Sequence, residues 1–254
     1  AGESKRTKIL PPGRIVQQIE ACGEWPGIRP LEGIVESPVL RPDGTILEAP
    51  GYDAATGLIF EPSGTFDPVS EKPTQGDACR ACAELLEAVA DFSFVGDAHR
   101  TAWLAAILTP LARYSFEGPA PLTHVDASVR GSGKTFLARI VGRIVSGREP
   151  FALPQVTDQE EERKRITSIA MQGDRLVLLD NVTHLGSPAL EAALTSTYWQ
   201  DRVLGSSESV RLPLLVTWIS TGNNAVIRGD MIRRINLVRL EPDCEQPEQR
   251  TGFR

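Results

Sequence analysis

Apolar residues follow two different periods along this chain. After residue 118, short apolar runs alternate with segments in which apolar residues return every three or four positions. Short apolar runs predict strands, and the longer spacing predicts helices that bury one face. The expected strands cover residues 122–127, 151–153, 176–179, 214–220 and 235–240, and the expected helices cover residues 136–145, 160–171 and 189–198. This alternation is typical of a parallel α/β sheet.

The first 118 residues show a weaker pattern. Residues 1–76 are rich in glycine and proline, and brief apolar runs predict short strands at 34–40, 45–47 and 58–60. Residues 77–94 and a stretch from Asp97 have helical spacing, and we expect Pro110 to kink or end the second helix. We therefore divide the chain into a β-rich N-terminal segment (1–76), a helical linker (77–118) and an α/β core (119–254).

The most specific chemical signal lies between the first core strand and the helix after it. Residues 128–135 read Ser-Val-Arg-Gly-Ser-Gly-Lys-Thr, a phosphate-binding loop in the strand–loop–helix context that this motif requires. Its glycines let backbone N–H groups face phosphates, its lysine reaches the β- and γ-phosphates, and its threonine hydroxyl can hold Mg²⁺. Ser128 replaces the usual first glycine. We expect a nucleotide site formed by Ser128, Arg130, Gly131, Ser132, Gly133, Lys134 and Thr135.

An acid follows the apolar run at 176–179. Asp180 would lie at the carboxyl end of the sheet, where ligands of open α/β folds bind, and would hold Mg²⁺ beside Thr135. A turn-capping aspartate is the alternative. Asn181 stands where many ATPases of this type carry a glutamate that activates water. Because asparagine cannot accept the proton, either Asn181 orients the water or an acid elsewhere is the base. The candidates for that acid are Glu160, Glu161 and Glu162.

Two polar stretches follow the strand expected at 214–220. Thr221-Gly-Asn-Asn224 would lie at the strand tip beside the phosphate-loop strand, where an amide can touch the γ-phosphate and the attacking water. A simple Gly-Asn turn is the alternative. Arg228-Gly-Asp-Met-Ile-Arg-Arg234 comes next, and in a ring ATPase an arginine here reaches the neighbour's γ-phosphate. Ordinary surface charge is the alternative. The expected sensor is Asn223 or Asn224, and the expected arginine finger is Arg233 or Arg234.

Residues 201–212 predict a β-hairpin, because apolar pairs flank a stretch of glycine and serine. Its cations are Arg202 and Arg211. A hairpin at this place points into the pore in ring motors, where one or two arginines can follow the phosphates of a single strand. A surface hairpin with ordinary charges is an equal alternative.

Composition changes this picture only slightly. The chain has 254 residues, of which 41% are apolar and 24% charged, an ordinary globular mixture. A net charge of -6 gives no general basic field for nucleic acid, although a ring can confine positive charge to its pore. No apolar run approaches the roughly 18 residues of a membrane span. No leader is evident, so we expect a cytoplasmic protein without membrane contact.

The remaining chemistry-bearing residues are scattered. Cys79 and Cys82 have C-x-x-C spacing, but zinc needs about four ligands and no second pair follows. We interpret them as reduced thiols and the histidines as structural. The chain begins at Ala1 and stops at Arg254, which we interpret as a piece of a longer protein.

Taken in order, the motifs resemble a known family. The set S-x-x-G-S-G-K-T, R-L-V-L-L-D-N, D-R-V-L-G, T-G-N-N and G-D-M-I-R-R is similar to the AAA+ ATPase domain of phage and prophage replication proteins of the primase–helicase type, related to superfamily 3 helicases. R-P-D-G-T from Arg41 and P-G-Y-D-A-A-T-G from Pro50 resemble the segment before that ATPase. The resemblance runs from about residue 30 to the end, and T-G-N-N followed by G-D-x-x-R-R is its most distinctive combination.

The resemblance implies a P-loop AAA+ fold of three layers and an ATP-hydrolysing DNA helicase. Such proteins form rings, usually hexamers, around single-stranded DNA and work with a primase or primase–polymerase module, here in a bacterial host or a virus-infected cell. By position, it assigns ATP and Mg²⁺ to Lys134 and Thr135 and the Walker B acid to Asp180. The alternative is a nucleotide-switched assembly or loader module with little unwinding. Protein remodelling ranks last, because it needs aromatic residues in the pore hairpin and residues 201–212 contain none.

Overall fold

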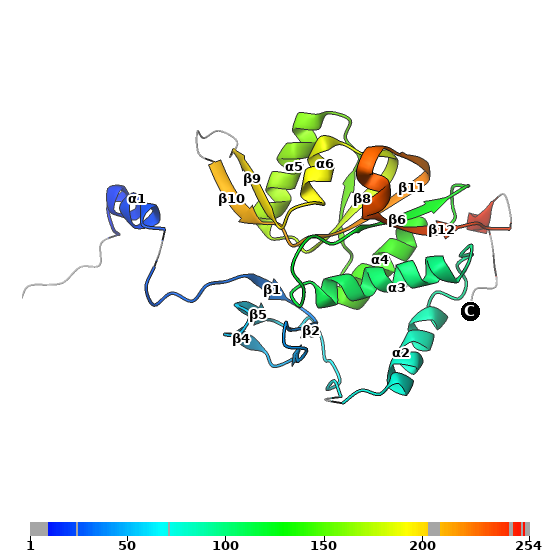
Figure 1. The fold of residues 1–254 in the computed structure, drawn as a ribbon, viewed down its shortest axis with the longest axis horizontal. Helices are drawn as coiled ribbons and strands as arrows, with labels where there is room; N and C mark the ends of the chain where they lie inside the picture. Colours follow the sequence, from blue (N-terminus) through cyan, green and yellow to red (C-terminus); the bar gives the residue numbers. More distant parts are fainter. Residues whose placement is uncertain are drawn as a thin grey trace, which may run out of the picture.

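A computed structural model describes residues 10–23, 25–70, 72–202, 209–243, 246–249 and 251. At the centre of this part of the chain is a five-stranded sheet in the order β12-β6-β11-β8-β7 (Figure 1). Its members are β6 (Leu122–Ala127), β7 (Phe151–Pro154), β8 (Leu176–Leu185), β11 (Thr217–Ile227) and β12 (Ile235–Leu240). Every neighbouring pair is parallel, so the carboxyl ends of all these strands meet at one edge. The predicted parallel α/β fold is confirmed.

Helices cover both faces of this sheet (Figure 1). On one side lie α3 (Asp97–Ala112) and α4 (Lys134–Ser146), and on the other lie α5 (Gln159–Gln172) and α6 (Pro188–Ala193). Neighbouring residues of a strand point to opposite faces, which is why each strand supplies both apolar cores. On β11, Ile219 packs with α3 and α4, whereas Trp218 packs with α5 and α6. The result is the three-layer arrangement.

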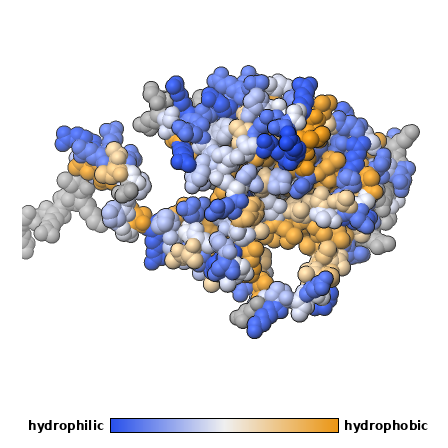
Figure 2. Space-filling model, in the orientation of Figure 1, coloured by the Kyte–Doolittle hydropathy of each residue, from blue (hydrophilic) through white to orange (hydrophobic). Residues whose placement is uncertain are grey.

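The N-terminal segment forms a small module of its own. It contains α1 (Gly13–Ala21), β1 (Gly33–Val35), β2 (Val39–Leu40), β3 (Ile46–Leu47), β4 (Gly51–Asp53) and β5 (Leu58–Phe60). Val35, Leu58 and Phe60 are among the residues of its core, against which Tyr114 packs from just beyond α3. In Figure 2, α1 stands apart from the body and is hydrophilic on one side and hydrophobic on the other.

The motif residues of this module have a structural role. Arg41 Nε donates to Asp53 Oδ2 at 3.2 Å, and its Nη2 lies 3.1 Å from Asp53 Oδ1. Thr56 Oγ1 also donates to Asp53, at 2.6 Å. The bond from Arg41 is the main reason that the pKa of Asp53 lies below its usual value. These contacts join the turn before β3 to the turn after β4.

The linker contains α2 (Gln75–Glu87) followed by α3. Thr74 and Asp77 form a reciprocal capping box at the start of α2. Pro110 lies in the last turn of α3, which ends two residues later at Ala112, in agreement with the prediction that it kinks or ends that helix.

Several element predictions were wrong in their bounds. Residues 189–198 do not form one helix: α6 ends at Ala193, and Tyr198 already begins β9 (Tyr198–Arg202), which pairs antiparallel with β10 (Ser209–Pro213). β8 and β11 both continue beyond the apolar runs that predicted them. Neither α1 nor β4 was predicted. The short helical turns η1 (Gly229–Arg234) and η2 (Pro247–Gln249) complete the described elements.

Candidate functional site

The phosphate-binding loop joins the buried strand β6 to the first turn of α4. Gly131 and Gly133 have positive φ angles of 72° and 81°, which turn the backbone toward the open side of the loop. The Ser132 hydroxyl donates to the Val129 carbonyl at 3.2 Å and closes the turn. Ser128 is exposed at the loop entrance. The helix that begins at Lys134 directs its unpaired N–H groups into this concavity, which suits an anion.

Lys134 points back across the loop rather than into solvent. Its Nζ donates to the Val129 carbonyl at 3.2 Å, to Ser132 Oγ at 2.9 Å and to Asn223 Oδ1 at 2.7 Å. Burial lowers the pKa of Lys134, and the nearby carboxylates of Asp126 and Asp180 partly offset that effect. The predicted phosphate lysine and one of the predicted sensor asparagines are therefore in direct contact.

Asp180 accepts hydrogen bonds from the hydroxyl groups of two neighbouring elements. Thr135 Oγ1 donates to Asp180 Oδ1 at 2.8 Å, and Thr221 Oγ1 donates to the same oxygen at 2.6 Å. Asn181 follows with a positive φ of 57°, and its backbone N–H donates to Thr221 Oγ1 at 3.0 Å. Its side-chain Nδ2 lies 3.3 Å from Asp180 Oδ2. Thr221 thus fixes both the acid and the residue after it.

The two sensor candidates have different partners. Asn223 holds Lys134, whereas Asn224 Oδ1 accepts a bond of 2.9 Å from Arg239 Nη2. Asn224 also has a positive φ, of 49°. The segment is therefore not the simple turn after a strand that the sequence allowed. It is an irregular part of β11, whose register against β8 shifts on both sides of Gly222.

The loop and the strand ends surround an open cavity of about 690 Å³. It is lined by Arg130, Gly131, Ser132, Gly133, Lys134, Thr135, Phe136, Asn181, Val182, Thr183 and Asn223. An adjoining hollow reaches Asp180. Among the described residues that line either space, Asp180 carries the only carboxylate. Glu160 and Glu161 instead pair with Lys164 and Arg165 on the surface of α5.

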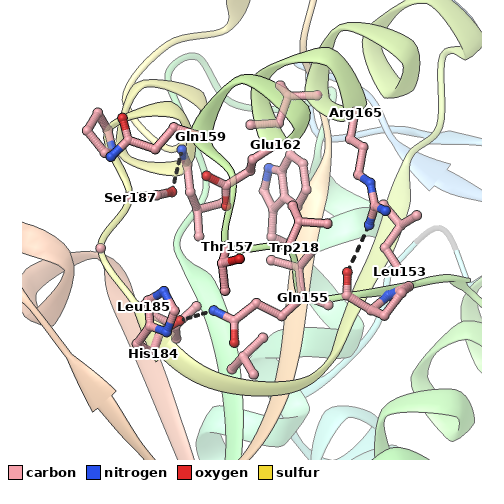
Figure 3. Close-up of a pocket in the computed structure, with 18 of the residues that line it drawn as sticks. Leu153, Gln155, Thr157, Gln159, Glu162, Arg165, His184, Leu185, Ser187 and Trp218 are labelled. Atoms are coloured by element: carbon pink, nitrogen blue, oxygen red, sulfur yellow. Dashed lines mark hydrogen bonds between the residues drawn. The ribbon is translucent and has the colours of Figure 1, made fainter.

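The remaining acid, Glu162, lines a second cavity of about 150 Å³ on the far side of β8 (Figure 3). Gln155 lines both this second cavity and the hollow that reaches Asp180. Its Nε2 donates to the His184 carbonyl at 2.6 Å, and its Oε1 accepts the Thr183 N–H at 2.7 Å. Trp218 lies deep in this second cavity, which its lining residues place between α5, α6 and β8. None of the three glutamates lines the phosphate cavity.

The predicted finger arginines lie outside that cavity. Both belong to η1, the turn between β11 and β12. Arg233 has a side chain that is 78% exposed and pairs with Asp230 at 2.8 Å. Arg234 is half-buried, and its Nε is buried without a hydrogen-bond partner. Arg233 is therefore the freer of the two to reach a second molecule.

Arg202 and Arg211 lie on the outer face of the hairpin formed by β9 and β10. Arg211 stacks over the ring of Tyr198, with 4.4 Å between its guanidinium carbon and the ring centroid. Tyr198 and both arginines are exposed, whereas Trp199 and Asp201 on the opposite face are buried against α5. The expectation of a hairpin without aromatic residues was wrong, because the prediction placed Tyr198 in a helix. Residues 203–208, which include most of the predicted hairpin tip at 205–209, lie outside the described residues.

Sequence reasoning missed four residues that hold the site. Thr221 and Gln155 fix the ends of β8 and β11, while Asp126 and Arg239 face each other across β6 and β12. One signal was available: Asp126 is an acid inside a predicted strand of the core, which calls for a cationic partner elsewhere.

Comparisons with known proteins give low similarity. No family model and no curated protein matches the chain. Among solved structures, JCV helicase bound to a small molecule has a TM-score of 0.37 and 16% identity, over 57% of this chain and 45% of that chain. The C-terminal region of NrS-1 has a TM-score of 0.43 and 18% identity, over 95% of this chain and 55% of that one.

The chain thus spans about half the length of the structures that it matches. Every TM-score quoted lies below 0.5, so these likenesses carry no argument about function. No described helix is long and apolar enough to cross a membrane.

Proposed function

We propose that this chain is the ATP-hydrolysing module of a ring-forming motor that moves on single-stranded DNA during phage or mobile-element replication. One observation carries the proposal: the phosphate loop after β6, an acid of β8 and an amide of β11 meet in one region of the surface. The joining contacts are Lys134 Nζ to Asn223 Oδ1 at 2.7 Å and Thr135 Oγ1 to Asp180 Oδ1 at 2.8 Å. Phosphoryl transfer depends mainly on such positioning and on electrostatic stabilisation.

Thr135 and Asp180 would hold Mg²⁺, which would supply positive charge that offsets the negative charge of the phosphates. Hydroxyl and carboxylate oxygens are the ligands that this ion prefers, and Mg²⁺ usually takes the rest from phosphate and water. A single protein carboxylate is therefore enough.

Asn181 would orient the attacking water. It borders the cavity, its backbone is fixed by Thr221, and its amide can both donate and accept hydrogen bonds. No described carboxylate other than Asp180 lines this space, so positioning rather than proton abstraction is the role that the site favours.

The DNA-binding role is proposed for the outer face of the β9–β10 hairpin. Arg202 and Arg211 supply positive charge for phosphates, and Tyr198 supplies an exposed ring on which a base can stack. This combination of cations and an aromatic ring is typical of proteins that bind single strands without reading their sequence. The primase or primase–polymerase module would lie in a longer form of this chain or in a partner.

The test is ATP hydrolysis with and without single-stranded DNA, measured together with the mass of the protein in solution with and without ATP. We expect hydrolysis that DNA stimulates, a larger assembly with ATP, and loss of hydrolysis in Lys134→Ala. The double substitution Arg202→Ala and Arg211→Ala should abolish the stimulation but preserve the DNA-free rate, because these residues lie outside the phosphate cavity. Arg80→Ala on exposed α2 is the matched control for lost surface charge.

Unchanged stimulation in the double variant would remove the hairpin from the DNA path. An ATP-dependent assembly that DNA does not stimulate at all would favour the loader or assembly module instead.

A further inference from the structure

Arg239 joins the outer strand of the sheet to the strand that leads into the phosphate loop. The parallel register of β12 and β6 places Arg239 directly beside Asp126. Arg239 Nη1 donates to Asp126 Oδ2, and the side chain of Asp126 is only 9% exposed. The other oxygen, Oδ1, is buried without a hydrogen-bond partner and lies 4.0 Å from Nε2 of buried His124. Arg239 is therefore the main partner of this buried carboxylate.

The other arm of the same guanidinium reaches the sensor segment. Arg239 Nη2 donates to Asn224 Oδ1 at 2.9 Å. Asn224 has a positive φ of 49°, in the part of β11 where the register is irregular. Its chain neighbour Asn223 is the residue that holds Lys134. The conformation of this exposed, strained dipeptide is thus tied to Arg239 on one side and to the phosphate lysine on the other.

The backbone of Arg239 makes a third connection. Its carbonyl accepts the Val95 N–H at 3.1 Å, and Glu241, two residues further along, donates its N–H to the Ser93 carbonyl at 2.8 Å. These bonds fix the segment after Phe92, whose ring lies against Gly133 of the phosphate loop. Three segments that surround the loop therefore meet at the end of β12: β6, the end of β11, and residues 92–95.

We propose that Arg239 is a positioning residue for hydrolysis: it orients Asn223 through Asn224, so that the sensor amide meets the γ-phosphate and the attacking water at the right place. This inference rests on the proposed function. Because η1, with Arg233 and Arg234, leads directly into β12, the backbone of this strand also connects the proposed finger arginines to Arg239.

The decisive experiment is a double-mutant cycle of Arg239→Gln and Asn224→Ala, read as kcat and as the directly measured affinity for ADP. If Arg239 acts by orienting the sensor, each single substitution should lower kcat about 10- to 100-fold, while the affinity for ADP stays within about threefold. The double variant should be no slower than the slower single variant, because both changes remove the same interaction. Arg239→Lys should recover part of the rate, since a lysine can still reach one of the two partners.

Arg143→Gln is the matched control, because Arg143 pairs with Glu149 on the surface at the far end of α4. Its kcat should equal that of the wild type. Losses of Arg239 and Asn224 that multiply in kcat would overturn the inference, as would an unchanged kcat in either variant. If Arg239→Gln does not fold, Asn224→Ala alone decides, because it leaves the buried Arg239–Asp126 pair intact: a wild-type kcat overturns the proposal.

Failure of the proposed function is distinguishable. A wild-type protein that hydrolyses no ATP overturns both the function and the role of Arg239. If Lys134→Ala abolishes hydrolysis but Arg239→Gln leaves kcat unchanged, only this inference is overturned.

Discussion

At the scale of single residues, Gly133 has no room for a side chain, because the ring of Phe92 lies against it. Its φ of 81° is one that side chains rarely adopt, and a Cβ there would come within 2.8 Å of Cε1 of Phe92. Gly173, after α5, has a similar φ of 68° but open space where its Cβ would be. Comparing substitutions at the two glycines therefore distinguishes the cost of backbone strain, which both share, from the cost of a clash, which only Gly133 has.

Gly133→Ala should weaken nucleotide binding by at least about tenfold, because the loop must shift to relieve the contact with Phe92. Gly173→Ala should cost about 1 kcal/mol of stability and leave binding unchanged. Thermal unfolding and titration with a fluorescent ATP analogue measure the two effects separately. Equal nucleotide affinity in the two variants would show that Phe92 yields to the new methyl group.

At the scale of elements, the junction between α5 and β8 contains an unsatisfied acid. Oδ2 of Asp174 is buried without a hydrogen-bond partner, and burial raises the pKa of Asp174 above 3.8, while Arg148 partly opposes the rise. The folded chain thus disfavours the carboxylate relative to the unfolded chain. Stability should fall as the pH rises from 3.8 through the raised pKa of the folded state.

Asp174→Asn removes this penalty and should stabilise the protein by roughly 1 kcal/mol at neutral pH. The gain should vanish near about pH 3, where Asp174 is protonated in both the folded and the unfolded chain. Denaturant unfolding at the two pH values measures it, with Asp67→Asn at an exposed position as the control. A gain of the same size at both pH values would mean that charge is not its cause.

At the scale of the whole molecule, the ring proposed above would bring η1 of one subunit to the open phosphate cavity of the next. Arg233 is exposed and bound only to Asp230 within its own turn, which leaves it able to exchange that partner for a phosphate of the next subunit. If the site is shared in this way, mixing Arg233→Ala with wild-type subunits should lower ATPase activity more steeply than the mutant fraction. An arginine finger is worth about 10³–10⁵ in rate, so each mutant subunit silences its neighbour's site, and in a ring whose subunits hydrolyse in turn one silent site also stalls the others.

Arg234→Ala in the same mixtures is the comparison, because its half-buried side chain is held inside the fold. A loss in simple proportion to the Arg233→Ala content would contradict a ring in which subunits share the arginine and hydrolyse in turn.

The sequence predicted the parts of this architecture that are local. The strand–loop–helix around residues 128–135 and the acid after the apolar run of β8 were predicted, because each depends on a few neighbouring residues. The contact of Arg239 with Asp126 was not, since it depends on which strands lie side by side and in which register. The end of α6 was misplaced because apolar periodicity continues from the helix into β9, where Trp199 packs against α5. The positive φ angles of Asn181 and Asn224 likewise depend on tertiary contacts.

The ammonium group of Lys134 has three N–H donors, and Val129, Ser132 and Asn223 already occupy all of them. A triphosphate that bound here would therefore have to replace at least one of these three acceptors. Whichever acceptor the phosphate replaces, the Lys134 ammonium already lies over the loop, so its side chain needs little rearrangement. If the displaced acceptor is Asn223, its amide is set free at the moment the phosphate arrives. The nucleotide-free and nucleotide-bound states would then differ in whether Asn223 binds Lys134. This difference would signal that nucleotide is bound before any bond of the nucleotide is broken.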